Sequence, residues 1–230
     1  MTTLETVTAS ALTWSFSALK TFQQCARRYD HQYIKKDVKD SGNEATIYGT
    51  VVHEDIENHL NGVAPLPAHH AKFLPAVQKV EQMEGDRYVE HKMALDFNLR
   101  PCDFDSPDRF VRGIADVLIV NGQNARVIDW KTGASSRYAD PKQLELMALM
   151  VFRHFPKVDK VRGGLVFLVV DQLVQATYFK KDQKQLWKKW IQDVQRIEIA
   201  KKNNTFTPSP SGLCGYCPVD GCEFKTSKRR

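Results

Sequence analysis

The pattern of hydrophobic residues changes character along the chain. It predicts helices over residues 46–60 and 71–84, and an earlier helix that begins at Ser15 or Ser17 and runs through Cys25 to Tyr33. Residues 87–99 and 110–120 then have the composition of strands, as do residues 164–170 and 174–179. Residues 141–155 are predicted to form an apolar helix and residues 183–201 an amphipathic one.

A tight turn is predicted between two of the strands. Asn121-Gly122 is a strong hairpin signal, and it lies between the apolar segments 116–120 and 126–130. The resulting order is helices, a mixed sheet with one crossover helix, a further helix, and a tail from Thr205 that is rich in Pro, Gly and Cys. This order predicts an α/β fold rather than a bundle or a sandwich. A chain of 230 residues can bury its own core as a single domain.

Two carboxylates and an ammonium group are predicted to meet where these strands end. Asp116 closes the segment Gly113-Ile-Ala-Asp116 on one strand, and Asp129-Trp-Lys131 ends the next. Asp129 and Lys131 are two residues apart, so they project from the same face. Two buried carboxylates are costly unless a cation is bound there, and Mg²⁺ and Mn²⁺ prefer oxygen ligands. Because Asp-x-Lys also occurs by chance in many proteins, this feature alone does not establish a catalytic site.

Two polar residues on the predicted helices could join this group. His53 shares a helical stripe with Ile56 and Leu60, so it points inward, either as a satisfied core histidine or as a ligand. Gln143 begins the apolar helix that follows Lys131, and it is either a surface residue or part of the site. His53-Glu54 does not continue into a zinc-peptidase motif, because the required second histidine is replaced by Glu57.

Three of the five cysteines are clustered near the C-terminus. Cys214, Cys217 and Cys222 lie within nine residues, and the Gly, Pro and Asp residues between them allow the loop to wrap a metal centre. Three thiolates leave such a site one ligand short; Cys25 is the natural fourth ligand and Cys102 its competitor. Thiolates bind both zinc and iron–sulfur clusters, so the ligand set leaves both open.

Together these motifs resemble the RecB-like branch of the PD-(D/E)XK nucleases. The pattern of that branch appears in order as Ser17-x4-Phe22-x2-Cys25, Gly49-x3-His53, Gly113-x2-Asp116, Asp129-x-Lys131 and Gln143. The resemblance implies a restriction-endonuclease-like core, a mixed sheet flanked by helices. It also implies that the divalent metal is bound by His53, Asp116, Asp129 and the main-chain carbonyl of Trp130. Lys131 would be the catalytic lysine, and Gln143 would contact DNA or brace the site.

Two further positions matter to this resemblance. Glu90, in the strand that precedes Asp116, is a minor candidate for an additional acidic residue of the site. The family often has a tyrosine four residues after the glutamine, whereas this chain has Met147, which puts substrate handling at that point in doubt.

The cysteines resemble those of iron–sulfur nucleases of the same branch, among them CRISPR-associated RecB-like exonucleases and the nuclease domain of the AddB helicase subunit. That resemblance implies a structural [4Fe–4S] cluster held by Cys25, Cys214, Cys217 and Cys222, with zinc as the alternative and Cys102 as a free thiol. It divides the single domain into an N-terminal helical segment (14–36), a nuclease core (46–180) and a cluster-binding tail (205–230). The expected activity is exonucleolytic hydrolysis of DNA at single-stranded or resected ends, in recombination, repair or CRISPR adaptation. A helicase, a recombination protein or a CRISPR integrase is then an expected partner.

Charge and composition agree with these expectations but do not decide them. The formal net charge of +6 and the pI of about 9.0 suit contacts with phosphates, and equally a solvated basic surface. Residues 1–12 lack a secretory signal, and no segment approaches the roughly 20 apolar residues of a membrane helix. A cytoplasmic location with no membrane contact is therefore expected. A non-catalytic DNA-binding module stays the alternative; a redox protein is disfavoured because no Gly-x-Gly-x-x-Gly run is present.

Overall fold

The structure, a computed structural model, describes residues 12–39, 42–137 and 139–225. The ends of the chain, including the last five residues of the predicted cluster-binding tail, lie outside the described residues. The helices are α1 (Phe16–Gln24), α2 (Ala26–Tyr29), η1 (Asp30–Lys35), α3 (Glu44–Leu60), η2 (Ala68–Phe73), α4 (Leu74–Glu81), α5 (Lys142–His154), η3 (Lys180–Asp182), α6 (Gln183–Lys202) and η4 (Cys214–Tyr216). The strands are β1 (Asp86–Asp96), β2 (Pro101–Cys102), β3 (Arg109–Asn121), β4 (Asn124–Lys131), β5 (Lys160–Phe167) and β6 (Gln172–Phe179).

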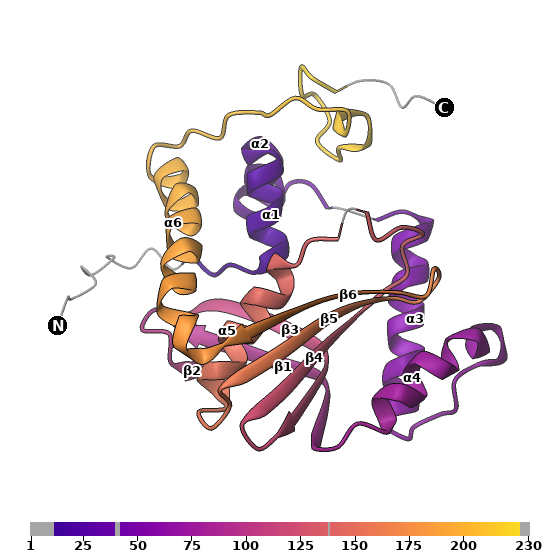
Figure 1. The fold of residues 1–230 in the computed structure, drawn as a ribbon. Coiled ribbons are helices and arrows are strands. Elements are labelled where there is room, and N and C mark those ends of the chain that lie inside the picture. Colours follow the sequence, from indigo (N-terminus) through magenta and orange to yellow (C-terminus); the bar gives the residue numbers. More distant parts are fainter. Residues whose placement is uncertain (1–11, 40–41, 138, 226–230) are drawn as a thin grey trace.

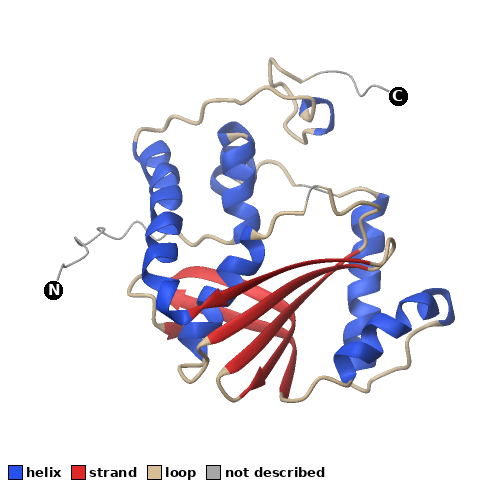
Figure 2. Ribbon diagram, viewed as in Figure 1, coloured by secondary structure: helices blue, strands red, loops and turns tan. Residues whose placement is uncertain are grey.

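The strands form one mixed, twisted sheet at the centre of the molecule (Figures 1 and 2). Its order is β2-β1-β3-β4-β5-β6. All neighbouring strands are antiparallel except β4 and β5, which are parallel and are joined through α5. A parallel pair needs a crossover connection of this kind, so the predicted mixed α/β fold is confirmed.

Helices cover both faces of the sheet, and a main hydrophobic cluster is buried on each face. On one face α1, α5 and α6 bury a large cluster that includes Trp187 and Trp190. On the other face α3 and α4 bury a smaller cluster around Ile56, Val117 and Trp130. The helix that carries His53 therefore lies across the sheet from the helix that carries Gln143. No helix among the described residues is long and apolar enough to cross a membrane.

Several predicted boundaries were wrong, for local reasons. The first helix ends at Gln24, because Cys25 has an extended backbone between α1 and α2. The third predicted helix is a 3₁₀ turn followed by α4, whose first turn contains Pro75, a position where the missing proline N–H costs nothing. The sequence Arg-Pro-Cys102-Asp-Phe predicts a loop, whereas Cys102 lies in the short strand β2.

The strand β5 begins at Lys160 instead of Gly164. Gly163 in this strand faces α5, and a Cβ there would lie 2.8 Å from Cβ of Leu144. The absence of a side chain thus allows the helix to approach the strand closely. The predicted hairpin is present, but its two loop residues are Gly122 and Gln123, with φ of 57° at Gly122. A glycine at the first loop position is typical of a type II′ turn.

Candidate active site

The central feature of the site is a fork in the sheet between β3 and β4. Their pairing runs from Asn121 opposite Asn124 to Val117 opposite Ile128 and ends there. Beyond that point β3 stays paired with β1, and β4 stays paired with β5. Asp116 and Asp129 are the first residues past the last pair. Their side chains therefore occupy the opening that the diverging strands create.

The side chain of Asp116 replaces the missing strand partner of β4. Its Oδ2 accepts a hydrogen bond of 2.7 Å from the backbone N–H of Trp130. The carbonyl of the same residue lies 2.8 Å from Nε2 of His53, which reaches the fork from α3. Both backbone groups of Trp130 thus meet side chains, not another strand. His53 Nδ1 is in turn 3.4 Å from Asp116 Oδ2.

The strands beside the fork also change the face to which their side chains point. In β3, Ala115 contributes to the core under α5, whereas Val117 contributes to the core under α3. Residues two apart normally share a face, so the strand turns over at Asp116. In β1 the same change separates Met93 from Val89. It coincides with Glu90, whose φ is 47°.

This irregularity brings Glu90 next to Asp116. The pairs Val89–Val117 and His91–Ala115 place the two acids opposite each other on β1 and β3. His53, Glu90 and Asp116 each offer a ligand atom within 4.8 Å of the other two. The sequence indicates Glu90 only as a supporting acid, because its position one strand before Asp116 does not show that the two side chains meet. The structure gives it a central place.

Gly49 explains why α3 can approach the fork. It lies one helical turn before His53, and a Cβ at this position would be 3.1 Å from Oγ1 of Thr132, which follows β4. That contact is tighter than most side chains tolerate, so glycine lets the helix pack closely against the end of β4. Asn43 caps the same helix by accepting a hydrogen bond of 3.0 Å from the N–H of Thr46.

Asp129, Lys131 and Gln143 form a closed ring of polar contacts. Lys131 Nζ lies 2.6 Å from Asp129 Oδ2 and donates a hydrogen bond of 3.1 Å to Oε1 of Gln143. Nε2 of Gln143 donates to Asp129 Oδ1. Asp129 and Lys131 share a face of β4, as predicted, and Gln143 meets them from the first turn of α5. The ring fixes the position of the lysine amine.

The electrostatics of the fork favour a bound cation. Burial and the neighbouring Asp129 raise the pKa of Asp116 well above its ordinary value. Burial also raises the pKa of Asp129, although the adjacent Lys131 opposes this, and burial raises that of Glu90. Burial lowers the pKa of His53, which favours the neutral imidazole that binds metals.

A divalent metal fits the residues that are present. Asp129 Oδ2 is buried beside the Lys131 amine, and a carboxylate oxygen has a further lone pair with which it can bind a metal ion. Three carboxylates face a single ammonium group. A hard divalent cation would offset the excess negative charge, and its preferred ligands are these oxygens and an imidazole.

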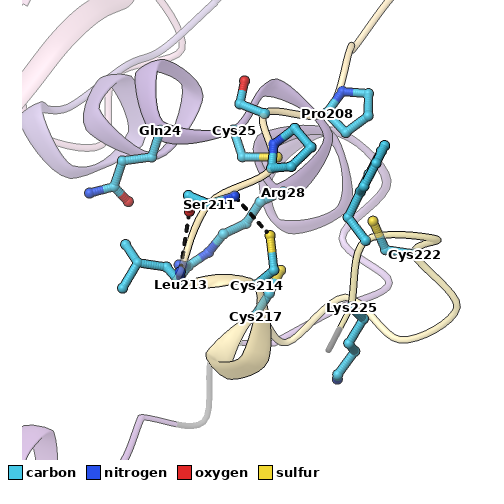
Figure 3. Close-up of a pocket in the computed structure, with 13 residues that line it drawn as sticks. Gln24, Cys25, Arg28, Pro208, Ser211, Leu213, Cys214, Cys217, Cys222 and Lys225 are labelled. Carbon is cyan, nitrogen blue, oxygen red and sulfur yellow. Dashed lines mark hydrogen bonds between the residues drawn. The ribbon is translucent and has the colours of Figure 1, made fainter. Parts of the chain in front are cut away.

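Four cysteines lie around a separate cavity beside the C-terminal end of α1 (Figure 3). The extended backbone at Cys25 lets this residue line the cavity together with Cys214, Cys217 and Cys222 from the tail, which passes over α2 in Figure 1. The structure therefore brings together the four predicted thiols. Cys102 lies on β2 and is not among the residues that line this cavity.

The surroundings of these thiols supply hydrogen-bond donors. The backbone N–H of Ser211 donates to Cys214 Sγ at 3.3 Å, and Arg27 Nη1 lies 3.8 Å from Cys222 Sγ. No three of these four sulfur atoms lie within 4.8 Å of one another. Tetrahedral zinc with Zn–S bonds of about 2.3 Å needs sulfurs only about 3.8 Å apart, so the observed arrangement is wider than a closed zinc site.

Comparison with known proteins identifies the family. The sequence profile of the PD-(D/E)XK nuclease superfamily matches residues 13–222. The chain belongs to the PD-(D/E)XK nuclease superfamily. Nucleases of this superfamily use divalent metal ions, and the acidic group at the fork is consistent with that requirement. No curated protein matches the chain.

Solved structures share the fold of this PD-(D/E)XK nuclease. A crystal structure of a protein named SSO0001 superposes with a TM-score of 0.51 at 16% identity, covering 97% of this chain and 92% of that one. A Eubacterium rectale protein with a provisional assignment as an exonuclease gives a TM-score of 0.50 at 13% identity, covering 88% of this chain and 86% of that one. At these identities the likeness supports the fold alone.

Proposed function

We propose that this PD-(D/E)XK nuclease is a metal-dependent DNA exonuclease of the RecB-like branch, acting on single-stranded or resected ends. The observation that carries the proposal is the convergence of Asp116, Asp129 and Lys131 at the fork in the sheet. The exonuclease assignment of the Eubacterium rectale neighbour and the net charge of +6 support it further.

The proposed metal ligands are His53, Asp116, Asp129 and the carbonyl of Trp130, and we add Glu90 because it lies within ligand distance of His53 and Asp116. When bound, the divalent metal would polarise the scissile phosphate and lower the pKa of an attacking water. His53 serves this role as the neutral imidazole that its burial favours.

Lys131 is the proposed catalytic lysine. Its ammonium group would stabilise the negative charge that develops on the phosphate, a contribution that depends on how well the donor is positioned beforehand. Asp129 and Gln143 supply that positioning through the ring of contacts around Nζ. Gln143 is therefore proposed as a brace for the lysine instead of a contact to DNA.

Cleavage of end-labelled linear single-stranded DNA tests this function. The wild-type protein is incubated with Mg²⁺ or Mn²⁺, beside Lys131→Ala and a chelator control. We expect degradation that disappears in both controls, with the labelled end reporting the polarity. Binding without cleavage by folded wild-type protein, with either metal, would favour the non-catalytic DNA-binding module.

We further propose that Cys25, Cys214, Cys217 and Cys222 hold a [4Fe–4S] cluster that ties the N-terminal segment (14–36) to the tail (205–230), beside the nuclease core (46–180). The shared cavity supports a common metal centre for the four thiols, and the resemblance to iron–sulfur nucleases favours the cluster over a single zinc ion. Its role is structural, because hydrolysis needs no electron.

Anaerobic purification followed by metal analysis tests the cluster. We expect a brown protein with about four iron atoms and four acid-labile sulfides per chain, as a cubane held by four thiolates requires. Cys25→Ser should lose the visible absorption, whereas Cys102→Ser should keep it. A colourless wild-type protein that contains zinc and no iron would overturn this proposal.

A further inference from the structure

One face of the sheet stays open beside the fork. Arg112 and Ile114 are two residues apart on β3, before the strand turns over at Asp116, so they share a face. The helices α3 and α4 cover this face only beyond Asp116, where Val117 and Ile119 enter their core. Ile114 retains 37% of its surface exposed, which is high for an isoleucine in a central strand. Lys92 stands opposite it on β1 and is also exposed.

An aromatic ring lies over this open face between two cations. Phe104, in the connection from β2 to β3, has Lys92 Nζ 5.6 Å from its ring centroid and Arg112 Cζ 5.1 Å from it. Lys92 and Arg112 bring cations to one half-buried ring, and the Asp105 carboxylate, which lies 3.8 Å from Arg112 Nη1, is exposed and can be displaced by a phosphate. We refer to Lys92, Phe104, Ile114 and Arg112 as the shelf.

The shelf is continuous with the proposed active site. Phe104, Arg112 and Ile114 line one groove together with Ser15, Ser17 and Gln143. Gln143, which lines this groove, also contacts both Lys131 and Asp129. Arg112 and Asp116 are four strand residues apart, or about 13 Å, which an extended nucleic-acid strand covers with a few nucleotides.

We propose that the shelf is a subsite for single-stranded DNA, in which Phe104 stacks on an unpaired base and Arg112 and Lys92 contact the neighbouring phosphates. Every base offers a flat face to an aromatic ring, and such stacking changes affinity by roughly 10- to 100-fold. In a duplex the bases are already stacked on one another, so the ring cannot reach them. The shelf thereby selects single strands near the site of cleavage. This inference rests on the proposed nuclease function.

The test measures binding of DNA by full-length protein that carries Lys131→Ala, so that the substrate stays intact. Phe104→Leu keeps an apolar side chain and removes the ring. Phe179→Leu is the matched control, because Phe179 is also exposed and also has a cation, Lys181 Nζ, 5.6 Å from its ring, but it lies on the edge strand β6. Fluorescence anisotropy reports the affinity for a single strand, a duplex, and single strands with one abasic position moved along the sequence.

We expect Phe104→Leu to weaken single-strand binding roughly 10-fold or more, with duplex binding and the Phe179→Leu protein unchanged. One abasic position should weaken binding by the protein with the intact ring but add no further loss in Phe104→Leu. Arg112→Gln should lower the salt dependence by about one phosphate contact.

Three results would each overturn the subsite. The first is an equal loss of affinity in Phe104→Leu and Phe179→Leu, and the second is an equal loss for single-stranded and duplex DNA in Phe104→Leu. The third is that an abasic position weakens binding as much in Phe104→Leu as in the protein with the intact ring, wherever it is placed. Failure of the parent protein to bind single-stranded DNA would overturn it as well. A wild-type protein that shows the stacking effect but cleaves nothing would contradict only the proposed nuclease function.

Discussion

The most informative perturbation of the site is Gln143→Leu. This change removes the acceptor that receives a 3.1 Å hydrogen bond from Lys131 Nζ and the donor to Asp129 Oδ1. The ion pair between Lys131 and Asp129 at 2.6 Å survives, so the lysine loses about one charge-assisted contact. Such a contact is worth about 1.5–3 kcal/mol. Because about 1.4 kcal/mol corresponds to a tenfold change in rate, kcat should fall roughly 10- to 150-fold.

The two Michaelis parameters distinguish bracing from DNA contact. If Gln143 acts only through Lys131, kcat falls while KM for single-stranded DNA stays within about twofold. Glu145→Gln is the control on the same helix, since the new amide oxygen can still accept the hydrogen bond from Trp190 Nε1. Circular dichroism confirms that each variant is folded. A raised KM with unchanged kcat would refute the brace and assign Gln143 to substrate binding.

Three further predictions concern stability, measured by urea unfolding. The raised pKa of Asp116 means that the metal-free protein loses stability as the pH rises from the ordinary aspartate pKa, about 3.9, towards the raised value. Asp116→Asn should remove the part of this pH dependence that Asp116 causes and stabilise the metal-free protein at pH 7 by about 1–3 kcal/mol. The same variant should no longer be stabilised by Mg²⁺. A variant that Mg²⁺ still stabilises would exclude Asp116 as a ligand. Gly113→Ala places a Cβ 2.4 Å from Cε of Met147 and should lower the free energy of unfolding by about 1–3 kcal/mol. Met147→Ala in the same chain should recover part of that loss. If the effects of the two substitutions simply add, the contact is contradicted. Asp55→Ala should lower the free energy of unfolding by about 1–3 kcal/mol, because Asp55 Oδ2 lies 2.7 Å from Nδ1 of the buried His70 and this contact holds η2 against α3. An unchanged midpoint of urea unfolding would show that the pair does not contribute to stability.

The contact between Gly113 and Met147 also explains a departure from the family pattern. Met147 occupies the position where the family often has a tyrosine, and its side chain fills the space over the glycine of the Gly113-x2-Asp116 motif. A flexible thioether fits such an irregular gap without a polar group that needs a partner. The residue therefore packs β3 against α5.

The order of helices and strands and the chemistry of the side chains could be predicted from the sequence, although several boundaries could not. Alternating and helical patterns depend on neighbours a few positions away, so they predicted the hairpin after β3, the crossover helix α5 and the common face of Asp129 and Lys131. The order of short motifs also predicted the superfamily, which the sequence profile confirmed. The sequence does not predict the break of the first helix at Cys25, because Cys25 continues the helical pattern. The extended backbone there lets Cys25 line the cavity with the tail, which is a tertiary contact.

The tertiary structure alone decided how these pieces meet. His53 and the carbonyl of Trp130 are 77 positions apart, and their contact depends on the packing of α3 across the end of β4. The fork between β3 and β4, and the local turnover that sets Glu90 beside Asp116, follow from strand pairing that no short segment encodes. Burial of the hydrophobic clusters on both faces of the sheet stabilises the packing that holds these contacts, so the site geometry is a property of the whole fold. The residues proposed to carry out the chemistry can be recognised in the sequence.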